Sequence, residues 1–268
     1  VTEIGRGAFA YCDRLRTVTL PFVGRTGEEQ NGHFGYIFDA ETYEENADCV
    51  PASLESVTIT RAGSLYSNAF FGCGHIRSIS LPAALSYVEE RVFSRCGSLT
   101  VLEVDSENPD LVGVQNCLID RRSRELLAGC AGSVIPEDGD LVTVIRSYAF
   151  YECDTLTEMT VPDNITWIGP WAFGGCTQLA SLSLPFAGTG RDPEAYSYFG
   201  NIFNGGNVPG PGTIPGSLKT VEIRSMPTLA SYVFQACYAV ETLILPADLA
   251  EIESLAFRDC NQLRATEI

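Results

Sequence analysis

One short pattern recurs along the whole chain: Ala or Val, then Phe, two variable residues and Cys. Its copies contain the pairs Phe9 and Cys12, Phe70 and Cys73, Phe93 and Cys96, Phe150 and Cys153, Phe173 and Cys176, Phe234 and Cys237, and Phe257 and Cys260. Three successive pairs of these Phe residues are 23 residues apart, a period typical of solenoid repeats. A unit of this length is too small to bury its own apolar side, so the units must stack and share a core. The spacing therefore predicts a repeat solenoid.

A second pattern follows each copy and predicts a short strand. In Leu15-x-x-Val18-x-Leu20-Pro21 the apolar residues alternate, so Val18 and Leu20 face one side of a strand and their neighbours face the other. The proline has no amide hydrogen for a continuing ladder, so it ends the strand. Nine such patterns begin at Leu15, Leu54, Ile76, Leu99, Leu156, Leu179, Leu218, Val240 and Leu263. We expect these strands to form a parallel sheet, with the Ala-Phe-x-x-Cys stretches forming short helices or 3-10 turns on the opposite side.

The chain also contains a larger duplication. A shift of 164 residues superposes Phe9 on Phe173 and Pro51 on Pro215. Both copies contain a long insert after their first strand, at 22–52 and 186–216. Between the copies, residues 104–142 are irregular and indicate a hairpin module with a basic turn at Arg121 to Arg124. We therefore expect one solenoid over 1–268, with a first half at 1–103, the module at 104–142 and a second half at 143–268.

These combined motifs resemble the BspA-like leucine-rich repeat family of bacterial cell-surface proteins. The resemblance rests on Ile168-Gly169-x-x-Ala172-Phe173-x-x-Cys176 with its following strand pattern, on Phe34-Gly35-Tyr36-Ile37-Phe38 in the first insert, and on Val104-Asp105-x-x-Asn108-Pro109. It implies a right-handed superhelix with a concave parallel sheet. It also implies a cell-surface or secreted location and adhesion to a protein or glycan on a host or bacterial surface. We expect the chain to be a segment of a longer protein, with any signal and anchor outside it.

The charge balance excludes some classes of partner. The chain carries 34 Asp and Glu against 17 Lys and Arg, a net charge of −17. Nucleic-acid binding draws its affinity from basic side chains that neutralise phosphates, so a nucleic-acid partner is not expected. The same argument applies to an anionic membrane surface, and no apolar run is long enough for direct membrane insertion. We expect a monomer.

The ten cysteines indicate structure rather than catalysis. Seven occupy one repeat position and are expected to form a column of buried thiols, because a single nucleophile would not be copied seven times. Cys49, Cys117 and Cys130 lie off this column, and a disulfide between Cys117 and Cys130 remains open because they lie on opposing arms of the hairpin module. No Cys-x-x-Cys motif is present and the chain has only two histidines, so neither a metal nor a cofactor is expected. We assign no catalytic residues and expect no enzyme activity.

The inserts contain the candidate binding residues. The side chains expected on the open face of the strands are mostly Ser and Thr, whereas binding anchors are enriched in Trp, Tyr and Arg. The candidates in the inserts are His33, Tyr36, Tyr43, Tyr196 and Tyr198. The insert phenylalanines are expected to pack onto the solenoid, and deletion of either insert is expected to abolish binding while the fold survives. The hypothesis is therefore an adhesion or protein–protein interaction module. The alternatives are a structural spacer that presents another domain and a carbohydrate-binding module that uses the insert aromatics.

Overall fold

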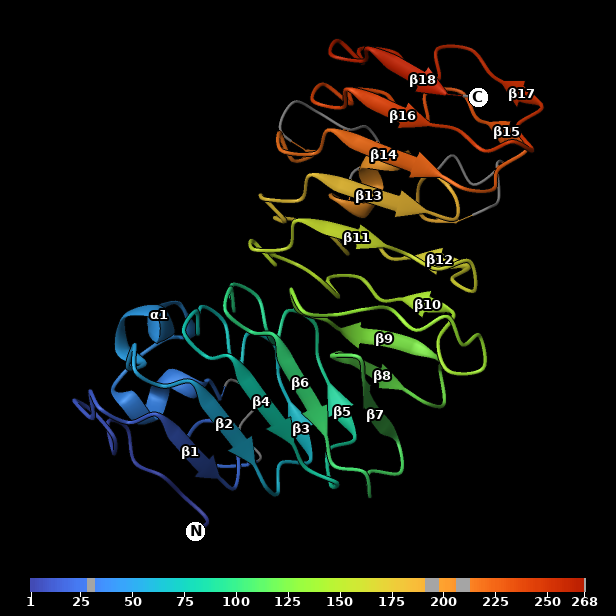
Figure 1. The fold of residues 1–268 in the computed structure, drawn as a ribbon. Helices are drawn as coiled ribbons and strands as arrows, with labels where there is room; N and C mark the ends of the chain where they lie inside the picture. Colours follow the sequence, from blue (N-terminus) through green and yellow to red (C-terminus); the bar gives the residue numbers. More distant parts are fainter. Residues whose placement is uncertain (28–31, 191–197, 206–212, 268) are drawn as a thin grey trace. The chain divides into compact units, whose positions relative to one another are not determined.

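The computed structural model describes residues 1–27, 32–190, 198–205 and 213–267, and it divides into two compact units (Figure 1). Unit 1 is Val1–Ser133 and unit 2 is Val134–Ile268. Each unit is a stack of strand-bearing coils. The division expected at residues 103 and 142 stays a prediction. Among the described residues, no helix combines the length and apolar character needed to cross a membrane.

Unit 1 is built on a parallel sheet in the order β1-β2-β4-β6 (Figure 1). Its strands are β1 (Thr17–Leu20), β2 (Ser56–Ile59), β4 (Ser78–Leu81) and β6 (Val101–Val104). Val57 pairs with Val18 on one side and with Ile79 on the other, so equivalent residues of successive coils form rows. A smaller parallel pair joins β3 (Ser64–Leu65) and β5 (Tyr87–Val88).

Unit 2 repeats this arrangement with the sheet β11-β13-β14-β16-β18. Its strands are β11 (Glu158–Thr160), β13 (Ser181–Leu184), β14 (Thr220–Ile223), β16 (Thr242–Ile244) and β18 (Ala265–Glu267). Parallel pairs also join β10 (Val144–Ile145) with β12 (Trp167–Ile168), and β15 (Thr228–Leu229) with β17 (Glu251–Ile252). All nine predicted strands are therefore present. Their alternating side chains and the prolines that follow them account for where they form and end.

The stretches opposite the main strands are hydrogen-bonded turns rather than helices. Residues two before and two after the repeat Phe have left-handed backbone, as at Asn68 (φ 63°) and Gly72 (φ 72°) around Phe70. A left-handed residue cannot continue a right-handed helix, so each turn is limited to a few residues. The amides of Phe70 and Gly72 instead donate to Val92 O and Ser94 O of the next coil, both at 2.9 Å. The backbone hydrogen bonds of the turns therefore join the coils to one another.

The short helices lie in the inserts. They are η1 (Phe34–Phe38), η2 (Tyr43–Glu45), α1 (Asn46–Cys49) and η4 (Phe199–Ile202). In the first insert, Phe34 N donates to Ala69 O, and Ile37 O accepts from Phe9 N, both at 2.8 Å. These are the bonds that adjacent coils make elsewhere, so η1 takes the place of a coil on the turn side.

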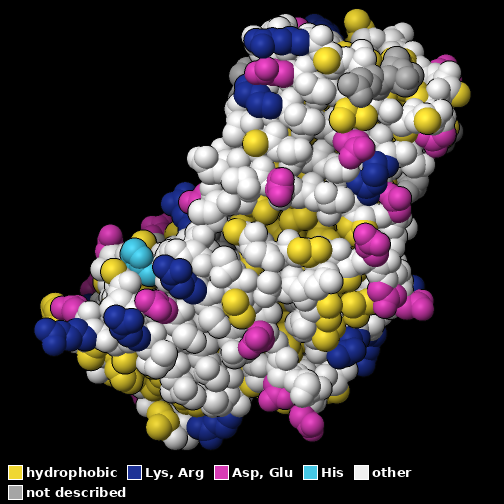
Figure 2. Space-filling view, in the orientation of Figure 1, with side chains coloured by type: hydrophobic (Ala, Val, Ile, Leu, Met, Phe, Trp, Pro, Cys, Tyr) yellow, Lys and Arg dark blue, Asp and Glu magenta, His cyan; other side chains and the backbone are white. Residues whose placement is uncertain are grey.

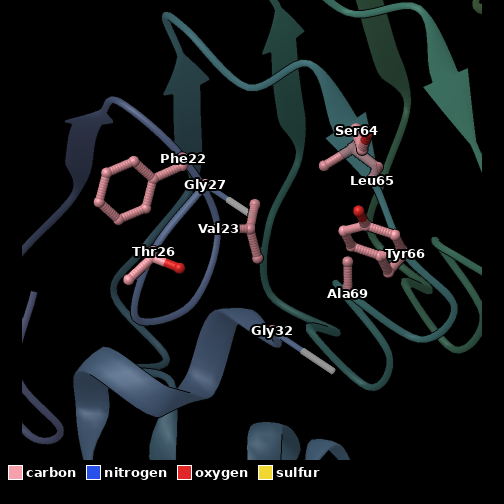
Figure 3. A pocket seen from close by; sticks show the side chains of 9 residues that line it. All are labelled: Phe22, Val23, Thr26, Gly27, Gly32, Ser64, Leu65, Tyr66 and Ala69. Carbon is pink, nitrogen blue, oxygen red and sulfur yellow. The ribbon is translucent and has the colours of Figure 1, made fainter. Parts of the chain in front are cut away.

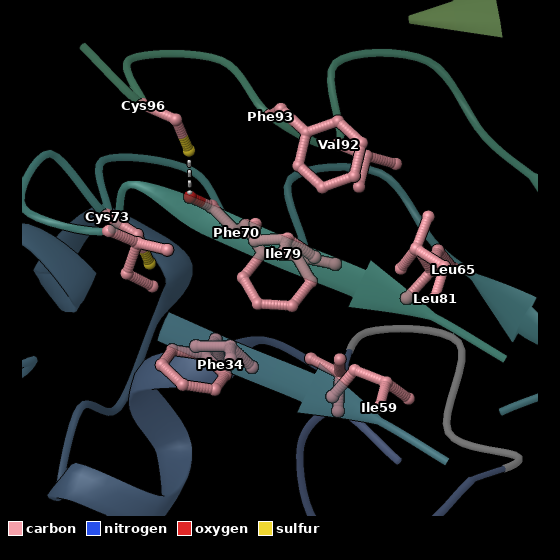
Figure 4. Packing of buried hydrophobic residues seen from close by; sticks show 14 of the residues in the cluster. Phe34, Ile59, Leu65, Phe70, Cys73, Ile79, Leu81, Val92, Phe93 and Cys96 are labelled. Carbon is pink, nitrogen blue, oxygen red and sulfur yellow. Dashed lines mark hydrogen bonds between the residues drawn. The ribbon is translucent and has the colours of Figure 1, made fainter. Parts of the chain in front are cut away.

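The rings of the inserts also complete the core. The ring centre of Phe34 lies 5.1 Å from that of Phe70, and the ring centre of Phe70 lies 5.7 Å from that of Phe93 (Figure 4). In unit 2, Phe199 lies 5.3 Å from Phe234 and is fully buried. The expected packing of the insert phenylalanines is therefore confirmed. The expectation that an insert could be deleted without loss of the fold stays a prediction, and the burial of these rings argues against it, because deletion would remove fully buried side chains from each core.

The predicted hairpin module is present in unit 1 as β7 (Leu111–Val114), β8 (Cys117–Asp120) and β9 (Glu125–Ala128). These strands pair antiparallel in sequence order. The basic turn between β8 and β9 is held by the Asp120 carboxylate, whose Oδ1 accepts from the amides of Arg122 (2.7 Å) and Ser123 (3.0 Å).

Candidate binding surfaces

The open face of the strands is polar and regular in unit 1. Most of its outward side chains carry hydroxyls and are exposed or half-buried, such as Thr17 and Thr19 on β1 and Ser78 and Ser80 on β4. On β6 the outward residues are Val101 and Glu103. Figure 2 shows acidic and basic side chains dispersed over the visible surface of each unit, with broad uncharged areas between them. This face lacks large aromatic anchors, as the sequence predicts.

In unit 2 the same face carries a hydrogen-bonded cluster around Arg224, which the sequence analysis did not identify. The guanidinium contacts Asp163 Oδ1 at 2.8 Å, donates to Ser183 Oγ at 2.5 Å, and also donates to Val161 O. Ser183 Oγ in turn donates to Glu222 Oε2 at 2.6 Å. One side chain from the end of β14 therefore binds groups on the two preceding coils. Its donors are directed at the protein itself, which indicates a stabilising role.

His33 does not face solvent. It is buried, and its Nδ1 lies 2.8 Å from Oδ1 of the fully buried Asn46. That oxygen also accepts from Gly35 N at 3.0 Å, and Asn46 Nδ2 donates to Phe71 O at 2.9 Å. His33 and Asn46 therefore fasten the first insert onto the coil of Phe70, and His33 has no open surface to offer a ligand.

The insert tyrosines are half-buried where the structure describes them. Tyr36 lies on η1, and Tyr43 on η2 has its ring 5.2 Å from Phe71 in an edge-to-face contact. Tyr198 directly precedes η4 in unit 2. Tyr196 lies outside the described residues. Tyr36 and Tyr198 thus lie on or beside helices with buried phenylalanines, whereas Tyr43 lies on η2, which has no buried residue, and packs on Phe71 instead.

A second group of aromatic side chains, the Tyr–Trp cluster of Tyr148, Tyr151 and Trp171, lies on the turn side of unit 2. The rings of Tyr148 and Trp171 are 6.2 Å apart and nearly parallel at 6°. The Tyr151 ring stands at 72° to both, at 5.2 Å from Tyr148 and 5.9 Å from Trp171. All three are half-buried. These three residues are not among the expected binding residues, all of which lie in the inserts. An alignment of the coils would have shown aromatic residues at positions that carry Asn68, Phe71 and Arg91 in unit 1.

A small hollow in unit 1 lies between the first insert and β3 (Figure 3). It is lined by Phe22, Val23, Thr26, Gly27, Gly32, Ser64, Leu65, Tyr66 and Ala69. Its side-chain polar groups are the hydroxyls of Thr26, Ser64 and Tyr66, so the lining contains no carboxylate, imidazole or thiol that could act as a general base. Within the part of the chain that the structure describes, no group of three or more His, Cys, Asp or Glu side chains could hold a metal ion.

Four of the seven column cysteines are buried in the core: Cys73, Cys96, Cys176 and Cys237. The expectation of seven buried thiols is wrong for Cys12, which is exposed, and for Cys153 and Cys260, which are half-buried. Cys96 Sγ donates to Phe70 O at 3.0 Å (Figure 4). In unit 2, Cys176 Sγ donates to Phe150 O at 3.2 Å. The thiol of one coil thus bonds the carbonyl of the Phe in the coil before it. Burial raises the pKa of Cys176 to about 12, so its reactive thiolate is disfavoured at neutral pH.

All ten cysteines are present as thiols, so the disulfide left open between Cys117 and Cys130 is not formed in the structure. Cys117 begins β8, whereas Cys130 follows β9 and has its Sγ 3.8 Å from Ser133 Oγ. Ser133 also hydrogen-bonds the Cys117 thiol. Both thiols therefore have a hydroxyl as a polar neighbour in a buried place. Burial raises the pKa of Cys117 to about 12.

Comparison with known proteins gives one family match. The BspA type leucine rich repeat region matches in six copies, over residues 47–112, 134–204 and 216–268. Comparison with curated proteins gives no match.

Several solved structures are similar to this chain. A leucine-rich cell surface protein of Faecalibacterium prausnitzii A2-165 is 21% identical, with a TM-score of 0.45 over 100% of this chain and 63% of its own. A leucine-rich repeat protein of Bacteroides ovatus is 17% identical, with a TM-score of 0.39 over 98% of this chain and 69% of its own. A leucine-rich repeat protein of Eubacterium ventriosum is 15% identical, with a TM-score of 0.39 over 81% of this chain and 77% of its own. The chain thus spans less than two thirds of the F. prausnitzii protein.

Proposed function

Because the chain belongs to the BspA-type leucine-rich repeat family, we propose that it is a non-enzymatic adhesion module, displayed on a bacterial cell surface or secreted, that binds a partner protein. Leucine-rich repeat proteins typically mediate protein–protein interaction and are generally non-enzymatic. The observation that carries the proposal is the half-buried position of the insert tyrosines, with Tyr36 and Tyr198 next to buried phenylalanines of η1 and η4 and Tyr43 against the ring of Phe71.

This arrangement favours binding because it fixes the tyrosines before a partner arrives. Tyr36 lies between the buried Gly35 and Ile37 on η1, and Tyr43 packs on Phe71. Side chains held in place lose little conformational entropy when a partner covers them. Tyrosine also combines a large apolar ring with a hydroxyl that suits a partly exposed place.

Point substitutions test the proposal better than deletion, since the inserts form part of each core. The full chain and its Tyr36→Ala, Tyr43→Ala and Tyr198→Ala variants would be tested on an array of extracellular-matrix proteins, bacterial surface proteins and glycans. Tyr11→Ala is the matched control, because Tyr11 is 91% exposed and lies on a turn outside the inserts. Circular dichroism verifies that every variant is folded.

We expect a protein on the array to bind the chain and the Tyr11 variant, and to bind the insert variants at least fivefold more weakly. No binding by the folded chain would refute adhesion to the proteins tested and favour the spacer. Saturable binding to glycans alone, lost in the insert variants, would favour the carbohydrate-binding module.

A further inference from the structure

In unit 1, an arginine side chain of one coil lies over an aromatic ring of the coil before it. The guanidinium carbon of Arg95 lies 5.2 Å from the centre of the Phe71 ring. Phe71 is the first residue after the repeat Phe70, and Arg95 is the second residue after the Phe of the next coil. An Arg over an aromatic face at this distance is a cation–π contact.

In unit 2, the coils of Phe150 and Phe173 have the same two repeat positions with different residues. Tyr151 takes the place of Phe71, and Gly175 takes the place of Arg95. The ring is therefore kept, but the next coil contributes no side chain at the position of the cation. Glu152 takes the place of Gly72, and a Cβ added to Gly175 would lie 2.7 Å from Glu152 Cγ. Unit 2 thus places a carboxylate-bearing side chain next to the position from which unit 1 supplies a cation.

The Tyr–Trp cluster around Tyr151 has a fixed geometry. A Cβ on Gly174 would lie 2.8 Å from Trp171 Cε3, and a Cβ on Gly205 would lie 2.6 Å from Trp171 Nε1. The indole can take its place only because both positions are glycine. Trp171 is therefore held between two glycines as well as against Tyr148 and Tyr151, which is the preorganisation that a binding site needs.

The fold itself does not require these aromatic residues. Asn68 and Arg91 stand in unit 1 where Tyr148 and Trp171 stand in unit 2. Tyr148 and Trp171 both have φ of 63°, a left-handed backbone that is uncommon for bulky residues. The same left-handed backbone occurs at this position in other coils that carry smaller or polar side chains, so the turn does not itself require an aromatic residue.

The charge of unit 2 indicates which ligand would be attracted. Residues 134–268 contain 16 Asp and Glu against 6 Lys and Arg, a net charge of −10. Such a field attracts cations and repels anions over several ångströms around the surface. A cation also suits the cluster, because Trp and Tyr faces attract positive charge and a nearby carboxylate adds an ion pair.

We propose that the Tyr–Trp cluster, together with Glu152, binds an arginine side chain of a partner protein. The inference rests on the proposed function and names the chemistry of its partner. The guanidinium stacks on the ring of Tyr151 and pairs with the Glu152 carboxylate, as the Arg95 guanidinium stacks on Phe71 within unit 1. Arginine fits better than lysine because its planar head can stack on a ring and donate to a carboxylate at the same time.

The test uses the full chain and a fluorescent peptide of four Gly-Arg repeats, acetylated and amidated at its ends. The control peptides replace each Arg by Lys or by citrulline, which keeps the planar shape of Arg but has no charge. Binding is measured by fluorescence anisotropy at 0.15 M salt. Tyr151→Ala and Trp171→Ala are informative variants because they leave the net charge unchanged, so any non-specific attraction persists. Trp167→Ala removes the other, 38% exposed tryptophan and is the matched control.

We expect the Arg peptide to bind more tightly than the Lys peptide, and the citrulline peptide not to bind. We expect the Tyr151 and Trp171 variants to bind the Arg peptide about fivefold more weakly or worse, while the Trp167 variant binds normally. The double variant Glu152→Gly with Gly175→Arg rebuilds the Gly72 and Arg95 pair of unit 1. It should fill the site from within and lose binding while its melting temperature is kept.

Equal binding of the Arg and citrulline peptides would refute the proposal. Normal binding of the Arg peptide by the Tyr151 and Trp171 variants would refute it as well. If a protein partner from the array bound the chain and these two variants equally, the adhesion proposal would be supported and the arginine site would be refuted. If no protein on the array bound the chain, the adhesion proposal itself would be refuted for the proteins tested.

Discussion

Replacement of Phe199 by Ala tests whether an insert is part of the core. Phe199 is fully buried, and its ring lies 5.5 Å from Phe203 and 5.3 Å from Phe234. Its amide also donates to Val233 O at 2.7 Å, so the backbone around it is fixed and can collapse little into a cavity. A buried Phe→Ala change in such a place costs about 3–5 kcal/mol of the free energy of unfolding. The conservative change Phe199→Leu keeps most of the volume and should cost about 1–1.5 kcal/mol.

Urea unfolding measures this loss. Both tryptophans, Trp167 and Trp171, belong to unit 2, so their fluorescence reports on the unit that contains Phe199. With a urea dependence of about 2 kcal/mol per molar, the Ala variant should unfold at a urea concentration lower by about 2 M, and the Leu variant by well under 1 M. A shift below about 0.5 M for Phe199→Ala would refute the reasoning, because the insert would then be an appendage rather than a layer of the core.

Three further predictions concern stability. Gly72→Ala should destabilise unit 1 by about 1 kcal/mol, measured by urea unfolding followed by circular dichroism, because φ of 72° disfavours a residue with a Cβ; no loss would contradict the left-handed turn. The raised pKa of Cys176, about 12 against 9.0, means that the unfolded chain releases its thiol proton first, so stability should fall as pH rises from 9 towards 12. Cys176→Ala should flatten that fall, and an unchanged slope would argue against the burial of the thiol. Arg224→Met should lower the free energy of unfolding by about 1–2 kcal/mol, because it leaves Ser183 Oγ and Val161 O without their donor; an unchanged urea midpoint would show that the cluster contributes nothing to stability.

The strands could be predicted from the sequence because their signal is local. Val18 and Leu20 alternate with polar neighbours, and Pro21 ends the strand. The left-handed turns could not be predicted in the same way, since the residues at those positions include Arg91 and Trp171 rather than glycine alone. The backbone there is set by hydrogen bonds to the next coil, about 23 residues away, and no local pattern records them.

For the candidate site residues too, local patterns could be predicted from the sequence and contacts between distant residues could not. Aromatic residues of the inserts could be located from composition, but the burial of His33 depends on Asn46, which lies 13 residues later and carries no motif. The Tyr–Trp cluster joins Tyr148 and Trp171 across two coils at positions that vary from repeat to repeat. Because the repeat consensus is strongest where the core demands it, a search for the consensus passes over the positions that are free to acquire a function.

The inserts also determine how each stack bends. β1 and β2 are direct neighbours in their sheet, yet on the opposite side the rings of Phe34 and Phe38 stand between Phe9 and Phe70. The side with the turns therefore holds one more layer than the side with the strands, a difference of about 5 Å if the layer is as thick as the strand spacing. The added layer increases the distance between coils on the turn side, so the coils diverge from the strand side towards the turn side. Insertion or loss of such a layer would then give this repeat a means of changing its curvature without altering a single strand.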